Sequence, residues 1–289
     1  MKRSEWLDRD GFAAWLFLAP ALLLLGIFLL FPIVYLVGLS FTTGSFTQEG
    51  LRWIGLLNYR RLLADPDFLQ VIGNTLYFTI ATLIPSLVIP LLLAVLLNEA
   101  IVLRGFFRSA YFIPSITSIV AVGLGFRWLF QDDGPVNGLL SKIGFATIPW
   151  LSSTVWAMPV LILLSTWKQI GFNMVVFLAG LQAIPQSRYE AAELDGANAR
   201  AKFWHITLPG LRPTLVFAAV TTAIFTLRGF EQVYAITGGG PLNSTNILVY
   251  YIYQQAFALF DFGYAAAAAT ILLAIALILV YLQLKTWQD

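Results

Sequence analysis

Few charged side chains interrupt the apolar stretches of this sequence, and two of them are candidates for binding chemistry. Lys168 lies about 12 residues, or roughly 18 Å at the rise of a helix, into one stretch, and Arg228 lies near the end of another. A charged residue within a membrane span usually faces the bundle interior or a water-filled cavity. Thr221, Phe225 and Arg228 have the i, i+4, i+7 spacing that places side chains on one helix face. An aromatic ring beside hydroxyl and cationic donors is a suitable lining for a sugar.

Each candidate also has a simpler structural explanation. Arg228 and Glu231 are three residues apart and could pair with each other. Lys168 could bind the carbonyl groups at a helix end, although its depth in the apolar stretch favours a cavity. Ser115 and Ser118 are expected to satisfy neighbouring backbone groups.

The residue counts exclude several other kinds of chemistry. The chain has no cysteine, which rules out disulfides, thiolate metal sites and a cysteine nucleophile. Its single histidine, His205, cannot build a multi-histidine metal site, so we expect no metal site and no cofactor bound by this chain. A net charge of +2 gives no broad field for nucleic acid.

The composition indicates that these side chains are positioned by helices in a membrane. Of the 289 residues, 59% are hydrophobic and only 11% are charged, whereas a soluble domain has about 25% charged residues. The mean hydropathy is +0.80. The N-terminus is similar to a secretory signal, but residues 11–48 carry no charge. That run is longer than a signal core of about 7–15 residues, so we expect a retained transmembrane helix.

Apolar windows of roughly 20 residues predict six transmembrane helices and an all-α membrane protein. The windows are roughly Phe12–Leu39, Ile72–Asn98, Ile113–Phe130, Val155–Gln182, Pro213–Glu231 and Phe262–Leu284. A shorter segment, Asn246–Phe260, is rich in Tyr and Gln and is typical of an interfacial helix.

The distribution of positive charge predicts that both termini are cytoplasmic, because Lys and Arg gather on that side. With this orientation the cytoplasmic segments hold ten Lys and Arg residues, namely Lys2, Arg3, Arg9, Arg104, Arg108, Arg188, Arg200, Lys202, Arg212 and Lys285. The outer loops hold four, namely Arg52, Arg60, Arg61 and Lys142.

The largest cytoplasmic loop, at about residues 183–212, carries the strongest motif in the chain. Ser187 and Glu190 have the spacing of a capping box, which predicts a short helix starting there. Gly196 is placed to end that helix in a left-handed conformation, and a second helix is expected at Asn198–Trp204.

This loop resembles the signature of bacterial ABC importer permeases. The matching residues are Glu190-Ala191-Ala192, Gly196, Ile206 and Leu208-Pro209, each at the spacing of the signature. Further residues resemble the carbohydrate-uptake branch, with its maltose-type and glycerol-3-phosphate-type permeases: Trp167-Lys168, Asn173, Leu181-Gln182-Ala183-Ile184-Pro185 and Thr237-Gly238-Gly239-Gly240-Pro241. The resemblance covers nearly the whole chain. Unlike the enterobacterial maltose subunit, this sequence shows no additional N-terminal helices and no large outer domain.

The resemblance implies the type I ABC importer permease fold, with residues 1–289 as a single transmembrane domain, and it assigns three groups of residues. A coupling helix that contacts the ATPase contains Tyr189, Glu190, Ala191, Ala192, Asp195 and Gly196. The substrate path contains Lys168, Gln169, Phe172, Asn173, Thr221, Thr222, Phe225 and Arg228. Gly238, Gly239, Gly240 and Pro241, in the outer loop Thr237–Phe260, are expected to dock an extracytoplasmic solute-binding protein; the alternative is that they only close the loop.

The implied function is that of a permease subunit for a sugar or sugar-like solute in a bacterial inner membrane. The expected partners are a second homologous permease, ATP-binding cassette ATPase subunits and the solute-binding protein. The chain has no Gly-x-x-x-x-Gly-Lys-Ser/Thr loop, so we expect ATP and Mg to be used by the partner ATPase and this chain not to be an enzyme. One alternative is a permease for glycerol-3-phosphate or another phosphate ester. A secondary transporter or channel is the alternative from another class, but the spans show neither inverted repeats nor acidic proton sites.

Overall fold

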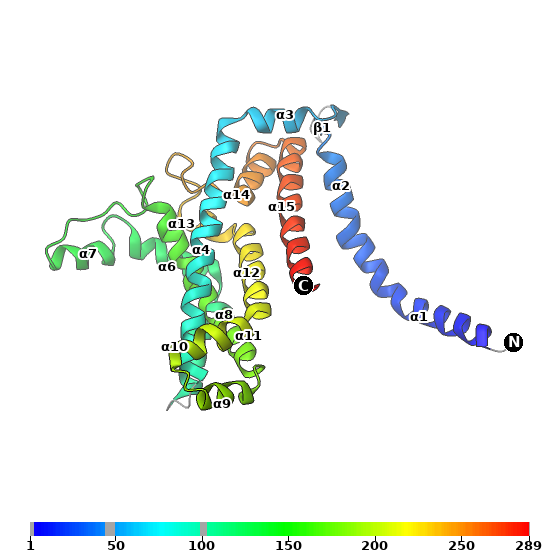
Figure 1. Cartoon of the computed structure of the whole chain (residues 1–289). Coiled ribbons are helices and arrows are strands. Elements are labelled where there is room, and N and C mark those ends of the chain that lie inside the picture. The colour runs from blue at the N-terminus through cyan, green and yellow to red at the C-terminus, as the bar shows by residue number, and fades with distance from the viewer. Residues whose placement is uncertain (1–2, 44–49, 99–102, 289) are drawn as a thin grey trace. The chain divides into compact units, whose positions relative to one another are not determined.

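The computed structural model describes residues 3–43, 50–98 and 103–288, and most of them are helical (Figure 1). Four helices are long and apolar enough to span a membrane, and two bent helix pairs raise the number to six if each pair crosses once. The predicted all-α class is therefore confirmed, although two of the six spans are not single straight helices.

One compact unit comprises the chain up to Ala64 together with Ile252–Ile271. Its elements are α1 (Arg3–Leu25), the π-helical turn η1 (Gly26–Leu30), α2 (Phe31–Leu39), the antiparallel strands β1 (Thr42–Thr43) and β2 (Arg52–Trp53), α3 (Leu57–Ala64), the π-helical turn η3 (Gln254–Ala258) and the start of α15 (Phe262–Gln288). Arg61 joins two parts of this unit, because its guanidinium lies 3.7 Å from the Asp261 carboxylate and 4.9 Å from the centre of the Tyr264 ring.

The second unit comprises Asp65–Tyr251 and the residues from Leu272 onward. Its elements before the C-terminal helix are α4 (Pro66–Asn98), α5 (Arg104–Ile116), α6 (Ile119–Phe130), α7 (Pro135–Lys142), α8 (Ala157–Gln182), α9 (Gln186–Leu194), α10 (Ala199–Lys202), the π-helical turn η2 (Phe203–Thr207), α11 (Leu208–Gly210), α12 (Arg212–Leu227), α13 (Glu231–Ile236) and α14 (Leu248–Tyr253). Within this unit, Figure 1 shows α9 and α10 at the C-terminal end of α4, with α7 projecting away from that helix.

The core of the second unit lies between α4 and α8. The buried cluster consists of Leu91, Ala94, Leu97, Met174, Phe177, Leu178, Leu181, Ile184, Leu211 and Ala218. Pro85 and Pro90 remain inside the continuous helix α4, because neighbouring helices can satisfy the backbone groups that a proline leaves unpaired. The two spans predicted at residues 72–98 and 155–182 are confirmed as α4 and α8.

The third predicted span, Ile113–Phe130, is wrong as a single helix. The segment is split into α5 and α6, and the chain bends by 94° between Gly105–Ile116 and Ile119–Lys142. Thr117 adopts an extended conformation and Ser118 caps the next helix by accepting a hydrogen bond from Ala121 N at 3.4 Å. Short hydroxyl side chains favour such breaks because they replace lost backbone hydrogen bonds.

The fifth predicted span, Pro213–Glu231, also differs from the structure. Helix α12 ends at Leu227, Arg228 caps it, and α13 begins at Glu231. Gly229 permits this break, because a Cβ at that position would collide with the Gln232 amide and approach Thr226 O. The segment predicted as an interfacial helix at residues 246–260 contains α14 and η3.

The capping box predicted at Ser187 and Glu190 is wrong, whereas the helix itself is present. Helix α9 starts at Gln186, and Pro185 is its N-cap without a side-chain hydrogen bond. The fixed φ of proline turns the chain into the helix before Ser187, which therefore lies inside the first turn. The predicted stop at Gly196 is confirmed, with φ +76° and the two backbone bonds Gly196 N to Glu193 O and Ala197 N to Ala192 O.

Candidate functional site

Two cavities lie side by side along α12, and both are walled by Thr221 and Phe225. The first, here called the aromatic cavity, has a volume of about 390 Å³ and is lined by Phe112, Ser115, Ile116, Lys168, Gln169, Phe172, Thr221 and Phe225. The second, here called the polar cavity, has a volume of about 370 Å³ and is lined by Ile119, Thr221, Ile224, Phe225, Arg228, Gly229, Phe230, Glu231 and Gln232. Both volumes fall in the range of about 300–1,000 Å³ that is typical of small-molecule sites.

The aromatic cavity is formed where α5, α8 and α12 approach one another. Gly171 allows the approach of α8 to α5, because a Cβ there would collide with the backbone of Tyr111 and Phe112. Phe172 and Phe225 are exposed by 39% and 36% and therefore offer ring surface to a ligand. Gln169 also lines this cavity and is 6% exposed.

Lys168 lines the aromatic cavity, but its ammonium group is occupied within the protein. Its Nζ donates hydrogen bonds to Pro114 O at 2.9 Å and to Thr117 O, at the C-terminal end of α5. In return, Ser115 Oγ donates to Lys168 O at 3.0 Å. The last carbonyls of a helix lack intrahelical partners and attract positive charge, so Lys168 satisfies the end of α5 where the chain bends.

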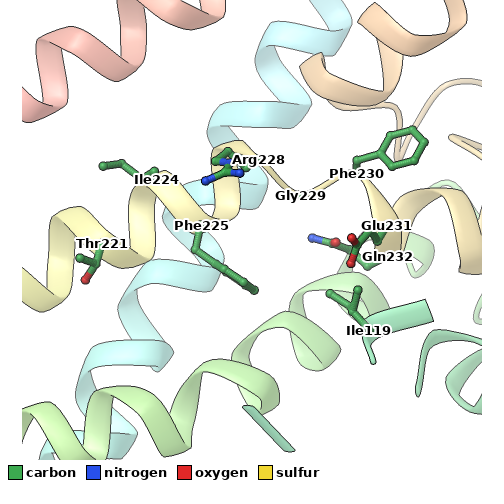
Figure 2. Close-up of a pocket in the computed structure, with 9 residues that line it drawn as sticks. All are labelled: Ile119, Thr221, Ile224, Phe225, Arg228, Gly229, Phe230, Glu231 and Gln232. Atoms are coloured by element: carbon green, nitrogen blue, oxygen red, sulfur yellow. The ribbon is translucent and has the colours of Figure 1, made fainter. Parts of the chain in front are cut away.

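The polar cavity contains charged groups of both signs. Figure 2 shows Phe225 projecting from α12 towards Ile119, Glu231 and Gln232 on the other side of the cavity. The side chains of Arg228 and Glu231 are both exposed. Among residues 103–288, no ion pair joins Arg228 to Glu231, so both charges are available to a ligand.

Asn173 and Thr222 lie inside the protein and line neither cavity. Asn173 Nδ2 donates to Ser86 O at 2.6 Å and to Thr222 Oγ1 at 3.0 Å. These bonds connect α8 to α4 and α12, so in this structure the pair holds three helices together.

The predicted coupling residues lie on and just after an exposed helix, α9, which is held by contacts to the segment that follows it. Glu190, Ala191, Asp195 and Gly196 are exposed, while Tyr189 and Ala192 are half-buried. The Tyr189 hydroxyl lies 3.0 Å from Thr207 Oγ1, and Lys202 Nζ binds Glu193 at 2.7 Å. The second helix expected at Asn198–Trp204 is present as α10 followed by η2, and Asn198 caps it by accepting a hydrogen bond from Ala201 N at 2.9 Å.

The predicted docking loop around Gly238–Pro241 is held in one shape by hydrogen bonds. Thr245 Oγ1 donates to Gly240 O at 2.7 Å and lies 2.8 Å from Thr237 Oγ1, whose hydroxyl can donate to it in turn. Asn74, on α4, donates to the carbonyls of Asn243 and Asn246 at 2.7 and 3.0 Å. The loop is thereby fixed to the first half of α4.

Sequence reasoning missed three features of these sites. Gln232 lines the polar cavity, but the break between α12 and α13 that brings it there was not foreseen. Phe112 adds a third ring to the aromatic cavity, but the bend between α5 and α6 that brings it there was not foreseen. Leu194 is 90% exposed at the end of α9, and its apolar type between Glu193 and Asp195 was the available signal.

Most of this sequence matches one protein family. Residues 13–289 match the model of the family described as the binding-protein-dependent transport system inner membrane component. The chain belongs to this family. Members of the family are transporter components of the inner membrane, so this multi-pass chain is a transport permease subunit.

Curated relatives in this transport family are named as sugar permeases. The arabinooligosaccharides transport system permease protein AraP of Bacillus subtilis is 39% identical over 98% of this chain and 92% of that protein. The lactose transport system permease protein LacF of Rhizobium radiobacter is 38% identical over 97% of this chain and 94% of that protein. The sulfoquinovosyl glycerol transport system permease protein SmoG of Agrobacterium fabrum is 39% identical over 91% of this chain and 87% of that protein.

Solved structures of ABC transporters have the same fold. A chain of a bacterial ABC transporter involved in import of the acidic polysaccharide alginate matches with a TM-score of 0.85 and 27% identity, over 98% of both chains. A chain of the bacterial alginate transporter in complex with an alginate pentasaccharide-bound periplasmic protein matches with a TM-score of 0.83, over 98% of this chain and 96% of that one. The predicted type I ABC permease fold is confirmed.

Proposed function

We propose that this chain is the permease subunit of an ATP-driven importer for a neutral sugar or glycoside. The observation that carries the proposal is the aromatic cavity, which is lined by three phenylalanine rings together with the polar side chains of Ser115, Gln169 and Thr221. Sugar rings stack on aromatic faces while their hydroxyls need donors and acceptors at the edges. The names of the relatives AraP and LacF support a saccharide as the solute.

Lys168 supports a neutral solute better than an anionic one. Its ammonium group is directed to the carbonyls of Pro114 and Thr117, so an anion in the aromatic cavity would have to compete for that charge. The path is completed by a second, homologous permease that closes the open side of the cavities.

The energy for transport comes from separate ATP-binding cassette subunits, which bind ATP and Mg. The chain itself contains no phosphate-binding loop of the required pattern. Helix α9 is the coupling helix, because it offers the exposed side chains of Glu190, Leu194 and Asp195 to a partner. The bond between Tyr189 and Thr207 makes α9 move with the helices that lead to the cavities. In this arrangement α9 and both termini are cytoplasmic.

An extracytoplasmic solute-binding protein docks at the opposite end, on the loop around Gly238–Pro241. Its hydrogen bonds to Asn74 and Thr245 fix the loop before a partner arrives, which lowers the entropic cost of docking. The related alginate transporter structure contains a periplasmic protein.

ATPase activity of the reconstituted complex tests this function. The complex contains both permeases and the ATPase, and it receives binding protein loaded with lactose or with glycerol-3-phosphate. We expect stimulation by the lactose-loaded protein. Stimulation only by the glycerol-3-phosphate-loaded protein would overturn the neutral-sugar assignment.

An anionic solute is the second candidate, and Arg228 is the observation that favours it. The Arg228 side chain is exposed in the polar cavity without an ion pair to Glu231. One of the related transporters imports the acidic polysaccharide alginate. The ATPase measurement above distinguishes the two candidates, because its two loaded proteins differ in solute charge.

A further inference from the structure

The amide of Gln232 is buried in the wall of the polar cavity without a hydrogen-bond acceptor. Gln232 is 1% exposed, and its Nε2 has no partner among the residues that the structure describes. Figure 2 shows this amide projecting from α13 towards α12. Gly229 leaves the space for it, because a Cβ there would collide with Nε2.

An unpaired buried amide costs free energy, and native proteins rarely keep one without a reason. Other buried polar atoms without partners, such as Ser165 Oγ and Thr166 Oγ1, line neither cavity. Gln232 differs because it lies where a ligand would be. The missing acceptor is therefore expected on the solute.

The remaining polar groups of the cavity indicate the chemistry of that solute. Arg228 can donate hydrogen bonds, and Glu231 can only accept them when it is ionised. Thr221 Oγ1 donates its proton to Phe217 O at 2.7 Å and can therefore only accept one from a solute. A sugar hydroxyl donates and accepts, so it can satisfy both kinds of group. A phosphate dianion offers acceptors almost exclusively and would be repelled by Glu231.

We propose that the polar cavity is a second solute subsite, in which Gln232 donates a hydrogen bond to a neutral hydroxyl-bearing unit. The unit is attached to one held in the aromatic cavity, because Thr221 and Phe225 line both spaces. The structure thus favours solutes of at least two linked units over single sugars. This inference rests on the proposed function and deepens it.

Replacement of Gln232 by methionine tests the subsite, since methionine keeps the length of the side chain and removes its donors. The measurements are the melting temperature of the purified complex and the amount of radiolabelled disaccharide imported per ATP hydrolysed by proteoliposomes. Lactose or arabinobiose serves as the probe, whichever the wild-type complex imports. Tyr234→Phe is the matched control, because Tyr234 lies on the same helix, is 53% exposed and lines neither cavity.

We expect Gln232→Met to melt at the wild-type temperature or above, because removal of an unpaired buried donor relieves a cost. Disaccharide imported per ATP should fall about tenfold, the factor that corresponds to a hydrogen bond of about 1.4 kcal/mol. Tyr234→Phe should keep the wild-type ratio.

Two results would overturn the subsite while the proposed function stands. One is that Gln232→Met imports as much disaccharide per ATP hydrolysed as the wild type does. The other is a lower melting temperature together with lower import, which would make Gln232 a structural residue. If the wild-type complex imports neither disaccharide but does import glycerol-3-phosphate, the proposed function fails first and the subsite fails with it.

Discussion

At the level of single residues, the ammonium group of Lys168 joins two helices that both line the aromatic cavity. It lies on α8 and binds carbonyls at the end of α5. Ser115, next to those carbonyls, binds back to Lys168 O. We therefore interpret Lys168 as a positioning residue that fixes the cavity wall.

Lys168→Met should destabilise the protein by about 2–3 kcal/mol, since charge-assisted hydrogen bonds are lost and buried carbonyls are left unpaired. A chemical denaturation curve of the purified chain measures this loss. Lys142→Met removes the same charge from an exposed position on α7 and serves as the control. Unchanged stability of Lys168→Met, with altered preference between lactose and glycerol-3-phosphate, would instead place the ammonium group in contact with solute.

Arg228 is expected to act on charge selectivity, because it is the exposed cation of the polar cavity. Arg228→Ala should lower uptake of an anionic solute about tenfold more than uptake of a neutral one, in line with the strength of charge-assisted hydrogen bonds. Uptake of glycerol-3-phosphate and lactose by proteoliposomes gives the two values. Equal losses for both solutes would indicate a structural role for Arg228.

At the level of elements, α9 has the features of a rigid contact surface. The turn at Gly196 closes its C-terminal end with two backbone hydrogen bonds, and Tyr189 fixes its underside to Thr207. The exposed face of α9 is therefore expected to remain rigid when a partner subunit binds and moves it.

Glu190→Lys should abolish uptake and the coupling of ATP hydrolysis to transport, because the charge on the exposed face is reversed. Membrane insertion should be unchanged, since the Glu190 side chain is exposed and forms no ion pair with another side chain of residues 103–288. Uptake assays and membrane fractionation measure the two effects. Leu139→Lys, at a 64% exposed position of α7, adds a positive charge on a different helix and should transport normally. Normal uptake by Glu190→Lys would remove the coupling role.

The straight helices could be predicted from the sequence, but the two breaks could not. Apolar composition alone defines α4 and α8, whose buried faces pack on each other. The break at Thr117 lies inside an apolar run, and it is stabilised by Lys168, which is distant in sequence. The break after Leu227 depends on the fit of Gln232 against Gly229. Both are tertiary effects, and both shape the cavities.

In the candidate site, too, the sequence predicted what depends on local spacing but not what depends on tertiary contacts. Thr221, Phe225 and Arg228 were predicted to share one helix face, and all three line the polar cavity. Asn173 and Thr222 are of the same polar types, yet they bond to each other inside the protein. Residue type and helical spacing do not distinguish a side chain facing a cavity from one facing a neighbouring helix.

At the level of the whole molecule, the second unit places the proposed coupling surface and docking loop at separate positions around the two cavities. The core between α4 and α8 is tightly packed, with Leu161, Met174 and Phe177 fully buried. Close-packed interiors transmit displacement with little compression. Movement of α9 can therefore reach the helices that line the solute path, which is the requirement for ATP-driven transport.

Uptake of radiolabelled lactose by proteoliposomes that contain the complete complex tests the central claim most directly. The binding protein is supplied outside, and ATP is enclosed or omitted. The account predicts accumulation of lactose against its gradient only with ATP and binding protein, and a lower accumulation of glycerol-3-phosphate than of lactose under the same conditions. Accumulation without ATP, or driven by an ion gradient alone, would contradict the account and indicate a secondary transporter.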